Sequence, residues 1–503
     1  MSLVVGKRWT TRRLVLPAIL VVATVLRLLF LDRKSLWYDE TAAMRLACTE
    51  SPMALVQLIQ QIDATRGLLH PLILQGWFQV FGVSAWSARF FSVICGVLTV
   101  ALAYRIGRRA FDKPTALWGA WLCAISPLLV TYSQEARMYA WLGLMSALAW
   151  DLLLSFRRSA PWGKQVAFGV CLTALGYSHP LGLFMVVALA AGYWANWRSF
   201  RLSPRNWLLI QMGFMACVLP WLPRYFDHSP EAPPTPFRAP YYLVNWLVHL
   251  TGGRTILLPL WFGLIAFGLW TRSGGIPGRR RPNRHVGATS LLLWWWVPTL
   301  LLYAYSIARY SLMGYPRYTL YVGPAFLILV AHGLARLPKP LRLATALLSL
   351  VGAGWMMVHT TYHPYHEFKY NFRDVVAQIQ RQDPSSPVIF VSPSPRDASI
   401  ATRTATGARL IDNNFEALKY HLKDRPDLIF IPADEAGESH SLDHPSYWFV
   451  YFNKPGIISS PRLEELEQHY QSEGASSFGP LYFARYRRSA PPPLKAKVER
   501  PTR

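Results

Sequence analysis

The sequence predicts an α-helical polytopic membrane protein with about eleven transmembrane helices and a small C-terminal α/β extracytoplasmic domain. Of its 503 residues, 52% are hydrophobic and only 16% are charged, which is an apolar excess for a soluble protein. The apolar residues form long blocks, and roughly 20 such residues suffice to cross ~30 Å of hydrocarbon. The 21 Trp and 24 Tyr residues suit a protein with long perimeters at the membrane interface.

Eleven apolar blocks have the length and composition of membrane-spanning segments, or come close to them. They lie at residues 14–31, 85–106, 115–130, 138–156, 165–178, 180–197, 207–222, 256–271, 286–307, 318–334 and 343–358. The first block follows basic residues, as in a signal peptide, but no small-residue cleavage pattern follows it, so we predict a retained anchor. The block Pro71–Phe81 is too short to cross a membrane and is predicted to lie at the interface or to re-enter.

The basic residues predict how these spans are oriented. Cytoplasmic loops of membrane proteins carry an excess of Lys and Arg, so we place the N-terminus in the cytoplasm and the C-terminal domain outside. The six segments that this orientation makes cytoplasmic all carry basic clusters: Lys7–Arg13, Arg105–Lys113, Arg157–Lys164, Arg198–Arg205, Arg272–Arg284 and Arg336–Arg342. No Asn lies in an Asn-x-Ser/Thr glycosylation context, which favours a bacterial plasma membrane.

The chain after His359 changes to alternating strand-like and helix-like runs, which predict a small α/β domain. The strand-like runs are Val388–Val391, Leu428–Ile431, Tyr447–Phe452 and Leu481–Tyr486, and the helix-like runs are Asp374–Arg381, Phe415–Leu422 and Leu463–Tyr470. We therefore predict a membrane domain at 1–360 with an outer catalytic loop at 32–84. An extracytoplasmic domain at 361–490 and a disordered basic tail at 491–503 follow.

An acidic pair, Asp39-Glu40, follows the first span of a strongly basic chain whose formal net charge is +25. Charged groups at a membrane are costly unless they are paired, hydrated or functional, so the pair is a candidate reaction centre. The structural alternative is that Asp39 caps a helix that begins at Glu40. The two roles are compatible, and both stay open.

Four further polar clusters fall on the same predicted outer face. They are His70-Pro71, Ser133–Tyr139, Tyr177–Pro180 and Pro316–Tyr318. Arg137 and Arg317 are expected at the starts of helices, where a cation opposes the macrodipole. A bound phosphate would compensate them, because helix N-termini and guanidinium forks both bind phosphate. The alternative is that these arginines extend to the interface as ordinary snorkelling side chains.

In this order, the motifs resemble those of the GT-C membrane glycosyltransferases. The quoted motifs are Trp-Tyr-Asp-Glu at 37–40, His-Pro at 70–71, Ala-Arg-Phe-Phe-Ser-Val at 88–93, Gly-Arg-Arg-Ala-Phe at 107–111, Gln-Glu-Ala-Arg-Met-Tyr at 134–139, Ser-His-Pro-Leu-Gly-Leu-Phe at 178–184 and Pro-Arg-Tyr at 316–318. The subgroup that they resemble most is formed by bacterial relatives of the protein O-mannosyltransferases and the lipid A aminoarabinose transferase, similar to glycosyltransferase family 39. The resemblance covers residues 14–340.

The resemblance implies transfer of a sugar from a polyprenyl-phosphate donor to an acceptor hydroxyl on the outer face, with inversion at the anomeric carbon. Asp39 would be the general base, and Glu40 would contact the donor sugar or orient the base. The remaining implied contacts to phosphate or substrate are His70, Arg89, Glu135, Arg137, Tyr139, His179, Arg317 and Tyr318. The chain departs from the aminoarabinose transferase pattern at His70, where a Lys before Pro is expected.

Several assignments stay open at this point. The acceptor is a lipid, a protein or a glycan, membrane lipids surround the chain, and no nucleic-acid partner is expected. A divalent metal held by Asp39, Glu40 or Glu135 stays open, although the sequence has no compact ligand spacing and no Cys-x-x-Cys motif. The alternative functions are a flippase or transporter of lipid-linked sugars, which needs charges near mid-span, and a polysaccharide ligase or polymerase.

Overall fold

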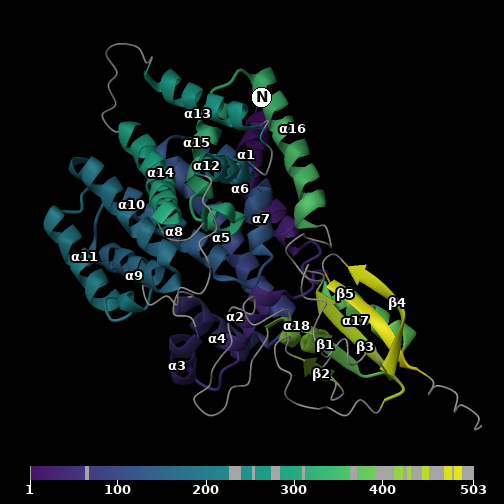
Figure 1. Cartoon of the computed structure of the whole chain (residues 1–503). Coiled ribbons are helices and arrows are strands. Elements are labelled where there is room, and N and C mark those ends of the chain that lie inside the picture. Colours follow the sequence, from purple (N-terminus) through teal and green to yellow (C-terminus); the bar gives the residue numbers. More distant parts are fainter. Residues whose placement is uncertain are drawn as a thin grey trace, which may run out of the picture. The chain divides into compact units, whose positions relative to one another are not determined.

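The structure is a computed structural model, and it describes residues 2–62, 67–225, 239–251, 255, 257–273, 284–308, 312–362, 371–391, 413–422, 428–431, 444–452, 469–478 and 481–489. Contacts divide the chain into two compact units (Figure 1). The helical unit comprises Met1–Arg33 and Ala43–His363, and the C-terminal unit comprises Lys34–Ala42 and Pro364–Arg503. The segment that carries Asp39 and Glu40 therefore groups with the C-terminal unit, which the sequence did not predict.

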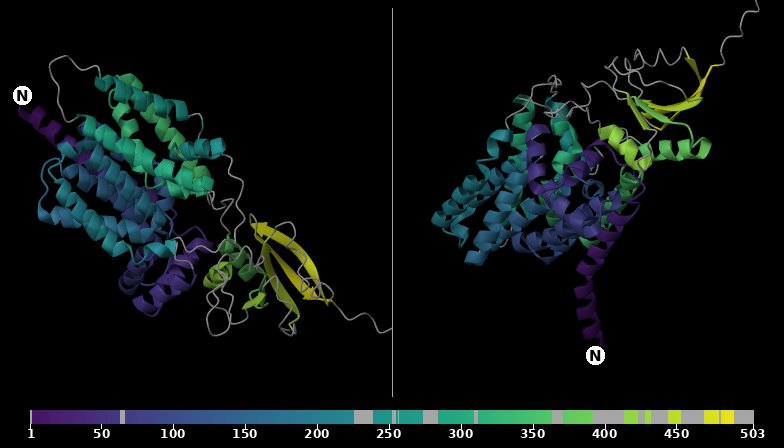
Figure 2. Two further views of the ribbon diagram at one scale, coloured as in Figure 1. Left: turned by 60° about the vertical axis from the view of Figure 1, so that its left-hand side comes forward. Right: turned by 90° about the horizontal axis from the view of Figure 1, so that it is seen from below.

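The helices of the first unit run alongside one another as a bundle (Figure 2). Its α-helices are α1 (Ser2–Leu28), α3 (Pro52–Ile62), α4 (Leu69–Phe81), α5 (Ala85–Ala110), α6 (Lys113–Ile125), α7 (Pro127–Ser133), α8 (Met138–Ser155), α9 (Trp162–Ser178), α10 (Pro180–Asn196), α11 (Pro204–Val218), α12 (Ala239–Leu250), α13 (Leu257–Ser273), α14 (Arg284–Ala308), α15 (Gly323–Leu334) and α16 (Lys339–Met356). Helix α2 (Tyr38–Ala47) begins in the C-terminal unit and ends in the helical unit.

Polar caps and prolines decide where several of these helices begin. The side chains of Ser84, Asp112 and Ser203 each accept a hydrogen bond from the backbone N–H three residues later, at the starts of α5, α6 and α11. These bonds satisfy donors that have no partner within the helix. Helices α6 and α11 also have Pro in their first turn, where the missing N–H costs nothing. The caps thus start new helices after very short connections.

Each of the eleven predicted blocks falls on a helix or on a bent pair of helices, but the count of eleven spans is not confirmed. Among the described residues, five helices are long and apolar enough to cross a membrane, or six if α6 and α7, bent by 56°, form one span. Three further apolar stretches among the described residues are shorter, Leu14–Leu28, Leu257–Thr271 and Gly323–Leu334, and a 15-residue helix rises only ~22 Å. The five long helices are Ala85–Ala110, Met138–Ser155, Pro180–Ser199, His285–Ala308 and Lys339–Thr361.

Helices α13 and α15 cross at two glycines, Gly268 and Gly333. A Cβ added to Gly333 would lie 1.9 Å from the carbonyl oxygen of Leu264, and one added to Gly268 would lie 2.7 Å from the Gly333 backbone nitrogen. Because real Cβ atoms do not approach other atoms so closely, even a methyl group must push the two helices apart.

We therefore expect Gly333→Ala to destabilise the helical unit by about 1–3 kcal/mol, the usual cost of overpacking. The matched control is Gly354→Ala in α16, where an added Cβ meets nothing within 4 Å, so its effect should be neutral or slightly stabilising. Thermal unfolding of the detergent-solubilised variants measures the difference. Equal melting temperatures for both variants would contradict the close crossing.

The C-terminal unit combines one sheet with two helices, α17 (Phe372–Gln382) and α18 (Asn413–Leu422). The strands are β1 (Val388–Val391), β2 (Leu428–Ile431), β3 (Ser446–Phe452), β4 (Tyr470–Phe478) and β5 (Leu481–Arg488). Their order is β2-β1-β3-β5-β4; β1 runs parallel to β2 and β3, and the β3–β5 and β5–β4 pairs are antiparallel. The alternation expected of strands sends Val388 and Phe390 into the core shared with α17 and α18, while Ile389 belongs to a second cluster.

The four strand-like runs and two of the three helix-like runs predicted for this region coincide with elements of the structure. Strand β4 was missed, because its sequence YQSEGASSF lacks an apolar alternation. The third helix-like run, Leu463–Tyr470, lies outside the described residues except for its end, where Tyr470 begins β4 instead. The predicted tail at 491–503 also lies outside them.

Candidate functional site

Two arginines that are far apart in the sequence meet at the ring of Tyr139. The guanidinium carbons of Arg137 and Arg317 lie 5.7 and 6.0 Å from its centroid, within cation–π range. The guanidinium carbon of Arg317 also lies 5.3 Å from the ring centroid of Tyr318. The rings of Tyr139 and Tyr318 meet edge-on, with their centroids 5.8 Å apart. We call these four residues the Arg–Tyr cluster. It concentrates two positive charges in a largely buried place.

The backbone around Arg137 explains how α8 contributes to the cluster. Arg137 is the N-cap of α8 and has extended backbone angles, and its N–H donates to the carbonyl oxygen of Glu135 at 2.8 Å. The first turn of α8 thus begins beside the guanidinium, and helix N-termini attract anions. Arg317 differs from the expectation: it lies in a single 3-10 turn, Pro316–Thr319, and α15 begins only at Gly323.

His179 joins the cluster from the junction of α9 and α10. It is the single residue between these helices, and its Nδ1 accepts the Leu181 N–H at 3.1 Å as the N-cap of α10. Its ring lies 6.1 Å from that of Tyr139 and 5.9 Å from that of Tyr318. Because Nδ1 acts as an acceptor, Nε2 carries the proton of the neutral ring. The cap therefore leaves His179 with an N–H donor beside the two tyrosines.

Glu135 and Tyr132 bring a carboxylate and a third ring to the same place. Glu135 is only 3% exposed, and Tyr132 lies within electrostatic range of both Glu135 and Arg317. The Tyr132 ring meets that of Tyr139 edge-on at 6.1 Å. A buried carboxylate next to arginines reduces the net positive charge of the site.

His70 lies at the start of α4 and is 2% exposed. Its ring is 5.9 Å from that of Phe91, and among the described residues its buried Nε2 has no hydrogen-bond partner. Burial and the positive charge of Arg137 lower the pKa of His70 to about 3. His70 is therefore neutral at physiological pH and lies within electrostatic range of Arg137.

This lowered pKa of His70 predicts how stability depends on pH. The unfolded chain takes up a proton at His70 near pH 6.5, whereas the folded chain takes it up only near pH 3. The unfolded state therefore binds more protons between these values, and stability falls on acidification through this window. We expect a loss of about 2 kcal/mol between pH 7 and pH 5 from this residue.

Melting temperatures of the wild type and His70→Gln at pH 7 and pH 5 measure this loss. The difference between the two pH values should shrink in His70→Gln, because Gln does not titrate. An identical pH dependence in both proteins would contradict the neutral, buried His70.

Gln134 and Arg89, two residues from the recognised motifs, bind the end of α1. The Gln134 side-chain amide donates to the carbonyl oxygens of Arg27 and Leu29 at 3.1 and 2.7 Å. Arg89 Nη1 donates to the carbonyl oxygen of Leu31 at 2.9 Å. These carbonyls lie where a helix leaves acceptors unsatisfied. The two side chains therefore fix the end of α1, from which the segment carrying Asp39 departs.

Arg27 is a structural residue that sequence reasoning missed. It is fully buried, and its guanidinium donates to the carbonyl oxygens of Ala124 and Cys123 and to the hydroxyl of Ser133. The carbonyls belong to the end of α6, where the bend to α7 leaves them without helical partners. The signal was an arginine inside the first apolar span, which is costly unless it is paired.

Asp39 and Glu40 lie in the first turn of α2. The helix begins at Tyr38, so Asp39 does not cap a helix starting at Glu40 as the structural alternative proposed; both carboxylates complement the positive end of the helix dipole instead. Asp39 is half-buried and Glu40 is only 1% exposed. Within the part of the chain that the structure describes, no three His, Cys, Asp or Glu residues are grouped so that they could hold a metal.

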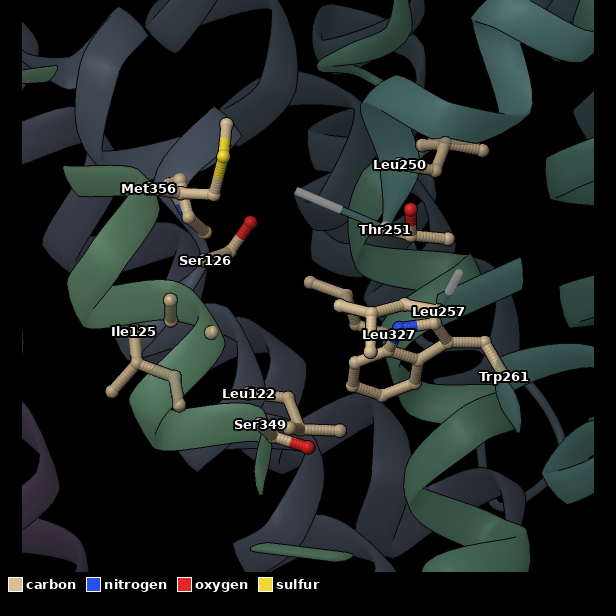
Figure 3. Close-up of a pocket in the computed structure, with 13 residues that line it drawn as sticks. Leu122, Ile125, Ser126, Leu250, Thr251, Leu257, Trp261, Leu327, Ser349 and Met356 are labelled. Carbon is tan, nitrogen blue, oxygen red and sulfur yellow. The ribbon is translucent and has the colours of Figure 1, made fainter. Parts of the chain in front are cut away.

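A cavity of the helical unit lies at the bend between α6 and α7 (Figure 3). Its empty volume is about 410 Å³, including open space at its mouth. Apolar side chains such as Trp261 and Met356 form most of its lining, with hydroxyls from Ser126, Thr251 and Ser349. None of its lining residues is charged, so this cavity cannot neutralise a phosphate.

Comparison with known proteins supports the fold class. Residues 65–223 match the family model described as dolichyl-phosphate-mannose-protein mannosyltransferase. The apo crystal structure of ArnT from Cupriavidus metallidurans is similar, with a TM-score of 0.57 and 15% identity over 96% of this chain and 98% of that one. Its structure bound to undecaprenyl phosphate matches with a TM-score of 0.54 and 15% identity over 93% and 97%.

A third similar structure comes from an archaeon. The oligosaccharyltransferase AglB from Archaeoglobus fulgidus, in complex with an inhibitory peptide and a dolichol-phosphate, matches with a TM-score of 0.50 and 12% identity over 96% of this chain and 74% of that one. No significant match is found among curated protein sequences. The protein thus has the fold of the GT-C superfamily of membrane glycosyltransferases, which confirms the recognition made from its motifs.

Proposed function

We propose that the protein is a glycosyltransferase that moves one sugar from a polyprenyl-phosphate donor to an acceptor hydroxyl, with inversion. The observation that carries this proposal is the Arg–Tyr cluster, where Arg137 and Arg317 converge on Tyr139 in a GT-C fold. Two similar structures hold undecaprenyl phosphate and a dolichol-phosphate. A polyprenyl phosphate is a leaving group that needs such a cationic site.

The cluster would stabilise the departing phosphate. As the bond from C1 to the phosphate oxygen breaks, negative charge grows on the phosphate, and preorganised cations and N–H groups stabilise it. Arg137 and Arg317 supply the charge, and their planar forks match phosphate oxygens. Neutral His70 and His179 would add N–H donors, and Glu135 would keep the arginines in place.

Asp39 would accept the proton of the acceptor hydroxyl while its oxygen forms the new bond to C1. One displacement at C1 inverts its configuration, and the proton ends on Asp39 while polyprenyl phosphate leaves. Glu40 would contact the donor sugar or orient Asp39. A base must come within about 2.6–3.2 Å of the hydroxyl it deprotonates, so the acceptor has to approach the first turn of α2.

The proposed orientation follows from the basic residues of the chain. With the N-terminus in the cytoplasm of a bacterial cell, the starts of α4, α8 and α10 face outward, and residues 361–490 form an outer domain. The donor would be used at the outer face of the plasma membrane. The identity of the sugar and of the acceptor, whether lipid, protein or glycan, would follow from the assay below.

Incubation of the purified protein with a polyprenyl-phosphate sugar and candidate acceptors tests the proposal. We expect free polyprenyl phosphate to appear and the acceptor mass to rise by one sugar. A flippase reconstituted in liposomes would leave the donor intact, and a ligase or polymerase would add a whole glycan. Either of those two results would overturn the proposal.

A further inference from the structure

We infer that His421, in the C-terminal unit, is a positioning residue that holds the segment leading into Asp39. His421 Nε2 lies 3.1 Å from Ser35 Oγ and 3.3 Å from the backbone nitrogen of Leu36. Residues 34–42 and α18 belong to the same compact unit although almost 400 residues separate them in sequence. The inference rests on the proposed function, because it takes Asp39 as the base.

The chemistry of the contact defines the state of the imidazole. A backbone N–H is always a donor, so Nε2 accepts from Leu36 and the ring proton of the neutral His421 lies on Nδ1. Leu36 is only 1% exposed, and a buried N–H without an acceptor is costly. His421 therefore supplies an acceptor that the backbone of this segment needs.

The contact is connected to the first turn of α2 through Trp37, which directly follows Leu36. The carbonyl oxygen of Trp37 accepts from the backbone N–H of Thr41 at 3.0 Å and from the Thr41 hydroxyl at 3.2 Å, which are bonds of the first turn of α2. The N–H of Leu36 is held by His421 on the other side. The backbone is thus restrained on both sides of Trp37, and this restraint sets the direction in which the first turn presents Asp39.

The sheet of the C-terminal unit anchors His421 in turn. Its neighbours Leu418 and Leu422 in α18 are buried in the core cluster that contains Trp448 and Val450 of β3. The ring of Tyr420 meets that of His421 edge-on at 5.3 Å. The sheet therefore holds α18 in place, and His421 of α18 binds the backbone of Leu36. Leu36 in turn restrains the segment that carries the acidic pair.

Two variants of the whole chain separate the effect of the hydrogen-bond acceptor of His421 from the effect of its aromatic ring. His421→Phe keeps an aromatic ring but removes the acceptor, and His421→Gln offers a carbonyl oxygen in its place. The matched control is His469→Gln, an exposed histidine of the same unit. Hydrogen–deuterium exchange of a peptide covering residues 35–40 reports the contact without any substrate. Steady-state turnover with a polyprenyl-phosphate sugar reports its effect on the reaction.

We expect His421→Phe to speed exchange in that peptide and to lower kcat about tenfold or more, because misplacing a catalytic group is costly. The KM for the donor should not change, since the Arg–Tyr cluster is untouched. His421→Gln should recover part of both effects, and the control should match the wild type. Unchanged exchange in His421→Phe would overturn the contact, and faster exchange with unchanged kcat would overturn the positioning role.

Peptides from β3 and β5 show whether the sheet stays folded in His421→Phe. If they also exchange faster, Ser35→Ala carries the test with the same two readouts, because it weakens the contact and leaves α18 intact. Failure of the proposed function would be visible elsewhere. If Asp39→Asn kept full turnover, Asp39 would not be the base, and His421 would have no base to position. The exchange result would still stand, because it tests only the contact between His421 and the segment before Asp39.

Discussion

Replacement of Asp39 by Asn is expected to lower kcat by about 10²–10⁴-fold, the usual contribution of a general base. Asn has the size of Asp but cannot accept the proton of the acceptor hydroxyl. The KM for the donor should change little, because the donor phosphate would bind at the arginines. Release of polyprenyl phosphate under saturating donor and acceptor measures the effect.

The matched control for this prediction is Asp32→Asn. Asp32 is exposed and precedes Asp39 on the same connection after α1, so its replacement removes a nearby negative charge without touching the proposed base. Its kcat should stay near that of the wild type. If folded Asp39→Asn, with an unchanged melting temperature, kept full turnover, Asp39 would not be the base.

Replacement of Arg137 by Gln is expected to lower kcat/KM by about 10²–10³-fold, as does the loss of one charge-stabilising donor from a preorganised site. Arg137 is only 7% exposed and lies beside Tyr139, so water could not replace the interaction that it would make with the phosphate. Arg137→Lys should rescue activity only in part, because an ammonium lacks the planar fork. Binding of free polyprenyl phosphate should also weaken, and it should weaken more in Arg137→Gln than in Arg137→Lys.

Arg33→Gln is the control for Arg137. Arg33 also lies over an aromatic ring, 4.5 Å from the centroid of Phe30, but it is exposed. Its replacement should leave both turnover and binding of polyprenyl phosphate near wild-type values. Equal binding of the lipid by Arg137→Gln and Arg33→Gln would exclude Arg137 from the phosphate site.

The helices of the helical unit could be located from the sequence, because long apolar blocks leave a strong local signal. Their lengths could not be predicted as well. The block at 115–130 is broken at Ser126 and Pro127, where a new cap starts α7, and the block at 318–334 shortens because α15 begins only at Gly323. Caps and prolines compete locally with hydrophobicity, and the hydrophobic pattern does not record which of them prevails.

The candidate residues could also be named from their motifs. The residues that each of them contacts could not be predicted. Gln134 belongs to the same motif as Arg137, yet its amide binds the end of α1 while Arg137 faces Tyr139. His421 lies in a short predicted helix and carried no signal at all. A motif specifies residue types in order, whereas these roles depend on which segments the fold brings together.

The sequence by itself determined the fold class and the residue types that the candidate site contains. Composition, apolar blocks and ordered motifs are local properties, so they can be read along the chain. The tertiary structure alone decided that Arg137 and Arg317 share Tyr139 and that His421 reaches Leu36. These contacts join segments that are far apart in sequence, and their geometry follows from helix packing that no local pattern encodes.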